Sequence, residues 1–359
     1  MMRMKPVVAL AIGLVLFIVL PANGGTPWKF VVMADSQGYG TDSTNTVSTV
    51  LLGDMATYVA NVVQPDLAVF VGDLADPAAS GQAAVESALN TWKTTMAPIY
   101  NAGIGVYPLR GSHDLGGNTK QTYSDAAWKN VFSTLPQNGP TGEVGLTYSF
   151  THNNATFLLL DEWRLNPDTW CTVNTTWVDQ QLAANTDPHI FSFTHSQIKK
   201  VEHDYCLDTI VPSVRNTLVN SLTAANAKVH FTGHMHLENF TRLNNDTVDP
   251  TNSSLIDDYY QVIVAPASQK FYDWDPESYD GNAIPGWTPY KVYNQENQNG
   301  FTVVTVDDLN VTVTYMRKYG AGDYRAESSF SYTAVPEPAS IGLLCAGMLT
   351  VLARRRKRR

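Results

Sequence analysis

Two histidines separated by one residue, His234 and His236, follow Gly233 at the end of the short apolar run 229–232. Residues i and i+2 of a strand point to the same side, so both imidazoles can reach one object if the strand geometry continues past the glycine. Imidazole is the commonest protein ligand of metal ions near neutral pH, which makes a metal ion the leading candidate. Such a pair alone is more often an ordinary strand end.

Other apolar runs upstream also end in residues that can bind metal or transfer protons. These are, in chain order, Asp35 with Gln37, Asp73, Ser112 with His113 and Asp114, and His195. In α/β proteins the binding crevice lies beyond the carboxyl ends of the strands. We therefore expect these side chains and the two histidines to converge at a single sheet edge.

The runs that carry these residues alternate with helical patterns, which predicts an α/β fold. Strands at 28–34, 67–71 and 104–109 alternate with helices at 47–63 and 83–100, as in parallel pairing with right-handed crossovers. A hairpin at 148–160, helices at 175–184 and 211–222, and strands at 190–194 and 228–232 follow. Beyond them we expect antiparallel strands at 259–265, 301–306 and 311–316, and a long loop at 266–300 near the site.

The N-terminal residues 1–25 are predicted to be a secretory signal peptide. Arg3 and Lys5 precede an apolar run from Val7 to Leu20, and small residues follow it. At about fourteen residues the run is short for a membrane span. A buried N-terminal helix is the alternative interpretation.

The C-terminal residues 334–359 combine Pro336-Glu337-Pro338, an apolar segment at 341–353 and a final run of six basic residues. These three parts, in this order, resemble a PEP-CTERM sorting signal, with a short transmembrane helix and a basic tail. The resemblance implies a Gram-negative bacterium, cleavage by an exosortase-type protease, membrane contact through the helix before processing, and a mature protein at the cell surface, in the extracellular matrix or secreted. A plain C-terminal anchor is the alternative.

The body left between these ends, 26–333, is strongly acidic. It holds 16 Lys and Arg against 32 Asp and Glu, a formal charge of −16, whereas the whole chain carries −9. Nucleic acid needs a basic footprint, so we expect no nucleic-acid-binding surface. Two cysteines of the body, Cys171 and Cys206, lie in a compartment that permits disulfides, and their pairing is left open.

The order and spacing of the strand-end residues resemble the motifs of the calcineurin-like metallophosphoesterases: D-x-H, G-D-x-x-D, G-N-H-D/E, a lone His and G-H-x-H. The correspondence spans 35–236. It implies a four-layer α/β/β/α sandwich that binds two divalent or trivalent metal ions. Because the ligands mix carboxylates and imidazoles, Mn, Fe or Zn fits better than Ca or Mg.

The resemblance implies a ligand set for each ion. Asp35 and His236 would bind one metal, His195 and His234 the other, and Asp73 would bridge both. Two positions depart from the family pattern. Gln37 stands where the first motif has His, and Ser112 where the third has Asn. Gln can offer a carbonyl oxygen, whereas Ser is a shorter and weaker ligand, so we expect the second metal to bind less tightly.

The resemblance also implies residues that act on the substrate. His113 would stabilise charge on the phosphoryl group or protonate the leaving oxygen, and Asp114 would orient its imidazole. Arg110 is either a contact to a phosphate oxygen or a surface arginine. The implied function is hydrolysis of phosphomonoesters or phosphodiesters by metal-activated hydroxide. The alternative is a surface or matrix binding protein on a decayed phosphoesterase scaffold.

Overall fold

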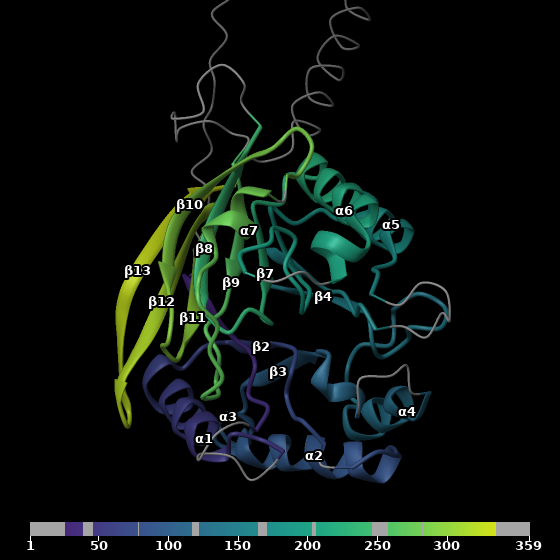
Figure 1. Ribbon diagram of the computed structural model, residues 1–359, viewed down its shortest axis with the longest axis vertical. Helices are drawn as coiled ribbons and strands as arrows, with labels where there is room; N and C mark the ends of the chain where they lie inside the picture. The colour runs from purple at the N-terminus through teal and green to yellow at the C-terminus, as the bar shows by residue number, and fades with distance from the viewer. Residues whose placement is uncertain are drawn as a thin grey trace, which may run out of the picture.

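Two β-sheets packed face to face organise the part of the protein that the computed structural model describes, residues 26–38, 46–77, 79–116, 122–163, 171–202, 206–245, 258–281 and 283–334 (Figure 1). The predicted signal peptide, and the predicted apolar segment and basic tail that follow residue 334, lie outside these ranges. Within them, no helix has the length and apolar character needed to cross a membrane.

The first sheet has the strand order β13-β12-β11-β1-β2-β3. Its members are β1 (Trp28–Met33), β2 (Leu67–Val71), β3 (Gly105–Leu109), β11 (Gly300–Asp307), β12 (Asn310–Gly320) and β13 (Asp323–Thr333). The predicted parallel pairing of β1 with β2 and of β2 with β3 is confirmed. Every residue of β2 is buried, as expected for an apolar strand covered on both faces.

The second sheet has the order β10-β8-β9-β7-β6-β5-β4. Its members are β4 (Tyr148–His152), β5 (Ala155–Leu159), β6 (His189–Phe193), β7 (Val229–Thr232), β8 (Glu238–Asn244), β9 (Tyr259–Ile263) and β10 (Thr288–Gln295). β5, β6, β7 and β9 run parallel. β9 therefore pairs parallel with β7 on one side and antiparallel with β8 on the other. The sequence-based interpretation of β9 as an antiparallel strand was therefore only half right.

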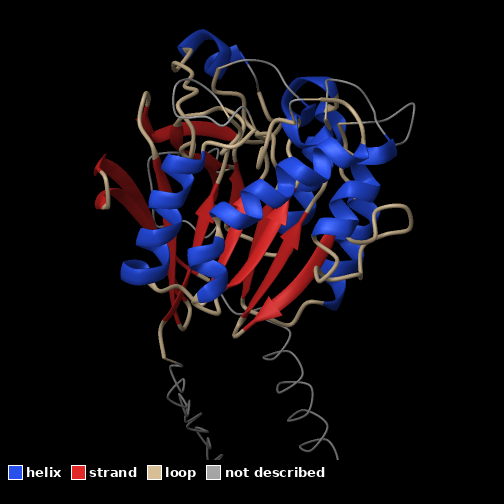
Figure 2. Ribbon diagram, turned by 90° about the horizontal axis from the view of Figure 1, so that it is seen from below, coloured by secondary structure: helices blue, strands red, loops and turns tan. Residues whose placement is uncertain are grey.

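Helices cover the outer faces of both sheets. α1 (Thr49–Tyr58) with the π-turn Val59–Val63, α2 (Gln82–Thr95), α3 (Ala97–Asn101) and α4 (Thr122–Val131) lie on the first sheet, and Figure 2 shows helices lying across its strands. α5 (Thr175–Ala184) and α6 (Pro212–Ala224) lie on the second. The expected four-layer α/β/β/α sandwich is confirmed.

The core between the sheets is aromatic. Phe30 of β1 reaches across to Phe157, Phe191 and Phe231 of the second sheet, with ring centroids 5.1, 4.8 and 6.1 Å away. Edge-to-face pairs at such distances add specific packing energy to the burial of apolar area. This packing fixes the two sheets against each other and thereby sets the separation of the strand ends.

Among the described helices and strands, the sequence did not predict α4, α7 (Pro276–Gly281), β8, β10 and β13. The segment 266–300, expected to be a long loop, contains the short helix α7 and β10. The expected single sheet edge is also wrong, because β1, β2 and β3 belong to one sheet and β6 and β7 to the other. The strand ends of interest therefore lie at neighbouring edges of two sheets.

Candidate metal centre

Two groups of buried side chains come together where the two sheets meet. Asp73, His195 and His234 form one group, and Asp35, Asp73 and His236 form the other; within each group the potential ligand atoms lie within 4.8 Å of one another. The first sheet supplies both carboxylates and the second sheet supplies the three imidazoles. Asp73 belongs to both groups.

The backbone at this place is held in an uncommon conformation. Asp35, Asp73, His234 and His236 have φ values of 53°, 51°, 69° and 48°, in the left-handed region that non-glycine residues seldom occupy. The Asp35 carboxylate accepts hydrogen bonds from the His234 amide at 3.1 and 3.0 Å, which links the two sheets. Such a concentration of unfavourable dihedrals is typical of functional sites, where the surrounding structure fixes them.

Close backbone approach explains the glycines of the motifs. A Cβ at Gly111 would overlap the backbone nitrogen and carboxylate of Asp73, and one at Gly72 would overlap the imidazole of His195. Glycine is thus required at both positions, since no other residue leaves room for the candidate ligand beside it.

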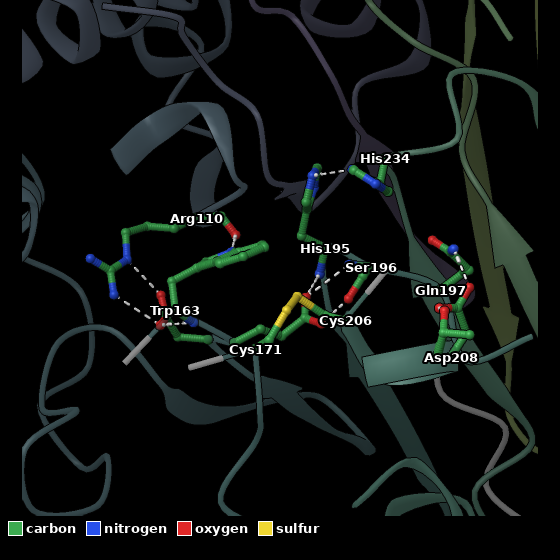
Figure 3. Close-up of a disulfide and its surroundings, with 12 residues drawn as sticks. Arg110, Trp163, Cys171, His195, Ser196, Gln197, Cys206, Asp208 and His234 are labelled. Carbon is green, nitrogen blue, oxygen red and sulfur yellow. Dashed lines mark hydrogen bonds and ion pairs between the residues drawn. A yellow bond between two sulfur atoms is a disulfide. The ribbon is translucent and has the colours of Figure 1, made fainter. Parts of the chain in front are cut away.

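The imidazoles present their nitrogens to the cluster. His195 Nδ1 lies 2.9 Å from the Val71 carbonyl oxygen and His236 Nδ1 lies 2.9 Å from that of Lys270. A carbonyl can only accept, so Nδ1 carries a proton and Nε2 is the nitrogen that faces inward, as in metal-binding histidines. His195 Nε2 lies 3.3 Å from Asp73 Oδ2 and 3.2 Å from His234 Nδ1 (Figure 3). These donor atoms thus face a shared space.

Protons balance the charges of the cluster in the protein without metal. Burial raises the pKa of Asp35 to about 7. Burial also acts to raise the pKa of Asp73, but the neighbouring imidazoles of His195 and His113 outweigh it and hold that pKa well below its usual range. Burial would lower the pKa of His195, yet the Asp73 carboxylate raises it to about 10. Because metal ligands must be deprotonated, a cation bound here would displace protons.

Gln37 and Ser112, the two positions that depart from the family pattern, both lie beside Asp73. Gln37 Nε2 lies 3.2 Å from Asp73 Oδ2 and 3.0 Å from His236 Nε2. Gln37 Oε1 is buried and has no hydrogen-bond partner among the described residues. A half-turn of the amide would aim this oxygen at the cluster, so Gln37 fits the ligand role. Ser112 Oγ lies 3.4 Å from Asp73 Oδ1, which is a long hydrogen bond.

His113 faces the cluster, but Asp114 does not hold it. His113 Nδ1 lies 3.2 Å from Asp76 Oδ2, and its Nε2 lies 3.9 Å from Asp73 Oδ2. The Asp114 carboxylate instead accepts the amides of Gly111, Leu74 and Ala75 at 2.8, 3.2 and 3.0 Å. The prediction that Asp114 orients the imidazole is therefore wrong. Asp76 takes that place, and Asp114 ties the loop after β3 to the loop after β2.

Arg110 is neither a phosphate contact nor a surface residue. Its guanidinium is fully buried and binds Asp161 through Nε at 2.6 Å and Nη2 at 2.9 Å, and Asp125 through Nη1 at 2.5 Å. In Figure 3 it points away from the His195–His234 pair. The substrate-binding prediction is wrong, because two carboxylates already occupy the donors of this side chain.

Sequence reasoning missed Glu162, which holds the backbone of His195 by a hydrogen bond. Glu162 Oε2 accepts the amides of His195 and Ser196 at 2.8 Å each, and Oε1 accepts the Ser196 hydroxyl. Burial raises the pKa of Glu162 to about 7. Two adjacent acids directly after an apolar strand were the available signal.

The two cysteines of the body form a disulfide beside this support. The Cys171–Cys206 bridge packs with Trp163, whose ring lies 6.3 Å from that of His195 (Figure 3). The bridge closes a sequence separation of 35 residues. The oxidised pair agrees with the exported setting that the sequence predicted.

The sequence profile of the calcineurin-like phosphoesterase family matches residues 29–238, so this chain belongs to that family. The PEP-CTERM protein-sorting motif matches residues 334–358 and indicates export to the cell surface of a Gram-negative bacterium. None of the curated proteins compared with the chain matches it.

Several solved structures share the fold. A structure of PhoD is 13% identical with a TM-score of 0.61, and the match covers 86% of this chain and 70% of PhoD. The purple acid phosphatase PPD1 from yellow lupin (Lupinus luteus) seeds is 15% identical with a TM-score of 0.62, covering 86% of this chain and 54% of the lupin chain. A dimetal phosphatase from Danio rerio is 14% identical with a TM-score of 0.55, covering 86% and 99%. The chain thus spans about half the length of the lupin enzyme.

Proposed function

We propose that this protein is an exported dinuclear-metal phosphoesterase that hydrolyses phosphomonoesters or phosphodiesters. The observation that carries the proposal is the pair of ligand groups that share Asp73. A carboxylate common to two groups is the arrangement that holds two cations close together, and paired cations serve phosphoryl chemistry. The mixed donors of carboxylate and imidazole favour Mn, Fe or Zn.

Two such cations would neutralise the phosphate and activate a water for attack on phosphorus. The residues of the chain prepare the site. The Val71 and Lys270 carbonyls hold His195 and His236 with Nε2 toward the cluster. His113 is the proposed general acid, because its side chain is 29% exposed and Asp76 holds its Nδ1. Its Nε2 can then deliver a proton to the leaving oxygen.

Protonation of His113 agrees with this role. Burial would lower the pKa of His113, but the carboxylates of Asp73 and Asp76 outweigh burial and raise that pKa above its ordinary value. An imidazole with a raised pKa remains protonated, and so remains an acid, near neutral pH.

The proposal is tested by metal content and turnover together. Purified protein loaded with Mn should hold about two ions per chain by elemental analysis, as expected from the two ligand groups. It should also release p-nitrophenol from p-nitrophenyl phosphate or from its bis ester. Absence of turnover with both esters, in protein shown to hold two ions, would contradict the hydrolytic assignment.

A second candidate is a surface or matrix binding protein with little activity, built on the same scaffold. Gln37 and Ser112 favour it, because neither matches the ligand that the family pattern has at its position. The same elemental analysis separates the candidates. A protein that holds no ion would support the binding protein, one ion per chain would support a mononuclear metal protein, and two ions would support the enzyme.

We further propose a division into a signal peptide at 1–25, a catalytic body at 26–333 and a sorting segment at 334–359. Trp28 pairs with Val306, and Thr333 pairs with Asn310 beside it, so both ends of the body lie opposite the edge that carries Asp35. A body attached through its C-terminal end would therefore turn the metal centre outward. Mass spectrometry of the mature protein should find its termini near 26 and 334 after exosortase processing.

A further inference from the structure

The segment that follows β9 is fixed against the metal centre. Pro266 forms a β-bridge with Ala34, and the Ala267 amide donates to the Ala34 carbonyl at 2.8 Å. Asn299 Nδ2 donates to the carbonyls of Pro266 and Ser268 at 2.8 and 2.7 Å. Because Ala34 directly precedes Asp35, the segment runs along the ligand-bearing end of β1.

Lys270 stands at the end of this fixed segment and contacts the cluster directly through its backbone and indirectly through its side chain. Its carbonyl accepts the Nδ1 proton of His236 at 2.9 Å. Its Nζ lies 5.2 Å from the ring centroid of Tyr272, and that ring meets His236 edge to face at 5.3 Å. The Tyr272 ring therefore lies between the Lys270 ammonium and the imidazole that the Lys270 backbone positions.

The Lys270 ammonium has a charge that the protein does not neutralise by direct contact. Among the described residues its Nζ pairs with the Tyr272 side chain and forms no ion pair with a carboxylate within 4.0 Å, whereas two carboxylates bind the guanidinium of Arg110. Lys270 is also only partly exposed, so its field is less screened than that of a lysine in open solvent. The Lys270 ammonium can therefore form an ion pair with an anionic ligand.

The field of Lys270 reaches both sides of the cluster. Burial raises the pKa of Asp35 and the Lys270 charge opposes that rise, whereas burial lowers the pKa of His236 and the Lys270 charge lowers it further. The Lys270 charge acts in the same sense on His113, although the carboxylates around His113 prevail. Together with the carbonyl contact to His236 and the Tyr272 ring packed between, this puts Lys270 on the His236 side of the cluster.

We propose that Lys270 binds a terminal oxygen of the substrate phosphate and selects the dianion of a phosphomonoester over the monoanion of a phosphodiester. The inference rests on the proposed function and names its substrate class. A phosphomonoester carries nearly two negative charges at neutral pH, since its second pKa is about 6. A diester carries one. The Lys270 ammonium attracts the dianion more strongly than the monoanion, because Coulomb attraction grows with charge. It also offsets locally the negative charge of the acidic body, which would repel a phosphate.

The test replaces the ammonium and follows both substrate classes. In metal-loaded protein, Lys270→Met should lower kcat/KM for p-nitrophenyl phosphate by about 10- to 100-fold, the range for one charge-assisted hydrogen bond, mainly through KM. The bis ester should lose less than about threefold. Lys270→Arg, which keeps the charge, should restore monoester activity to within about threefold of wild type.

A matched control is Lys291, an exposed lysine of β10 whose Nζ lies 4.7 Å from the ring centroid of Trp274. Lys291→Met should leave both substrates unchanged. Equal losses for both esters in Lys270→Met, or a fall in metal content by elemental analysis, would show that Lys270 only supports the structure and would overturn the inference. No change with either ester would overturn it as well.

Calorimetric titration with inorganic phosphate keeps the inference separate from the proposed function. Phosphate should bind metal-loaded wild-type protein at least about tenfold more tightly than Lys270→Met, as for the loss of one charge-assisted contact. If wild type hydrolyses neither ester, the proposed function fails, but this difference still supports the role of Lys270. Equal affinities, or no phosphate binding by wild type, would refute it.

Discussion

Replacing Asp76 by Asn tests which carboxylate holds His113, the proposed general acid. The change removes the negative charge 3.2 Å from His113 Nδ1 and keeps the size of the side chain. At this distance two unit charges interact by about 1.3 kcal/mol in bulk water and about 5 kcal/mol at an effective dielectric of 20. The Asp76 side chain is 46% exposed, which places the pair near the lower value.

We therefore expect Asp76→Asn to cost about 1 to 2 kcal/mol in the transition state, about a 5- to 30-fold loss of kcat. The sign of the pH effect follows from the same charge. Loss of the anion disfavours the imidazolium, so the pKa of His113 falls. A general acid loses activity above its pKa, so the falling limb of the pH profile of kcat/KM should move to lower pH.

Asp114→Asn is the matched control, because Asp114 is adjacent to His113 but binds backbone amides. It should lower the melting temperature and leave the position of that limb unchanged. A nuclear magnetic resonance titration of His113 in Zn-loaded protein measures the same pKa without turnover. A limb that moves with Asp114→Asn and stays in place with Asp76→Asn would refute the assignment.

Three further predictions concern metal binding and stability. Asp73→Asn should remove most bound metal in elemental analysis, since it weakens both ligand groups at once. Asp161→Asn should lower the free energy of unfolding by about 3 to 5 kcal/mol, measured by chemical denaturation, because it leaves the buried Arg110 charge with one partner. Asp125→Asn should lower it clearly less, because the Asp125 side chain is 20% exposed. Burial raises the pKa of Glu238 from 4.5 to about 8, so between these pH values the folded state keeps a proton that the unfolded state releases. The free energy of unfolding should therefore fall by up to about 5 kcal/mol as pH rises from 4.5 to 8. Glu238→Gln should flatten this decline, and an unchanged dependence of unfolding free energy on pH would contradict the prediction.

Local sequence patterns were sufficient for much of the fold. β2 is a continuous apolar run and β1 is apolar except at Lys29, so the burial of both strands follows from their composition. The missed strand β13 has mostly exposed, polar residues, and the missed β8 is rich in polar residues that are nevertheless buried. Their strand conformation depends on pairing with β12 and with β9 and β10, which no local pattern contains.

The sequence by itself determined that Asp35, Asp73, His195 and the final histidine pair stand at strand ends, because a strand and the turn after it are set by residues close in the chain. Only the tertiary structure decided the partners of the side chains around them. His113 and Asp114 lie in a single 3₁₀ turn, where consecutive side chains diverge by about 120°, so one faces the cluster and the other the backbone. Lys270 reaches His236 from 34 positions away. The direction of each side chain and the contacts between residues far apart in the chain depend on how the two sheets pack, and the spacing of residues in the sequence does not determine them.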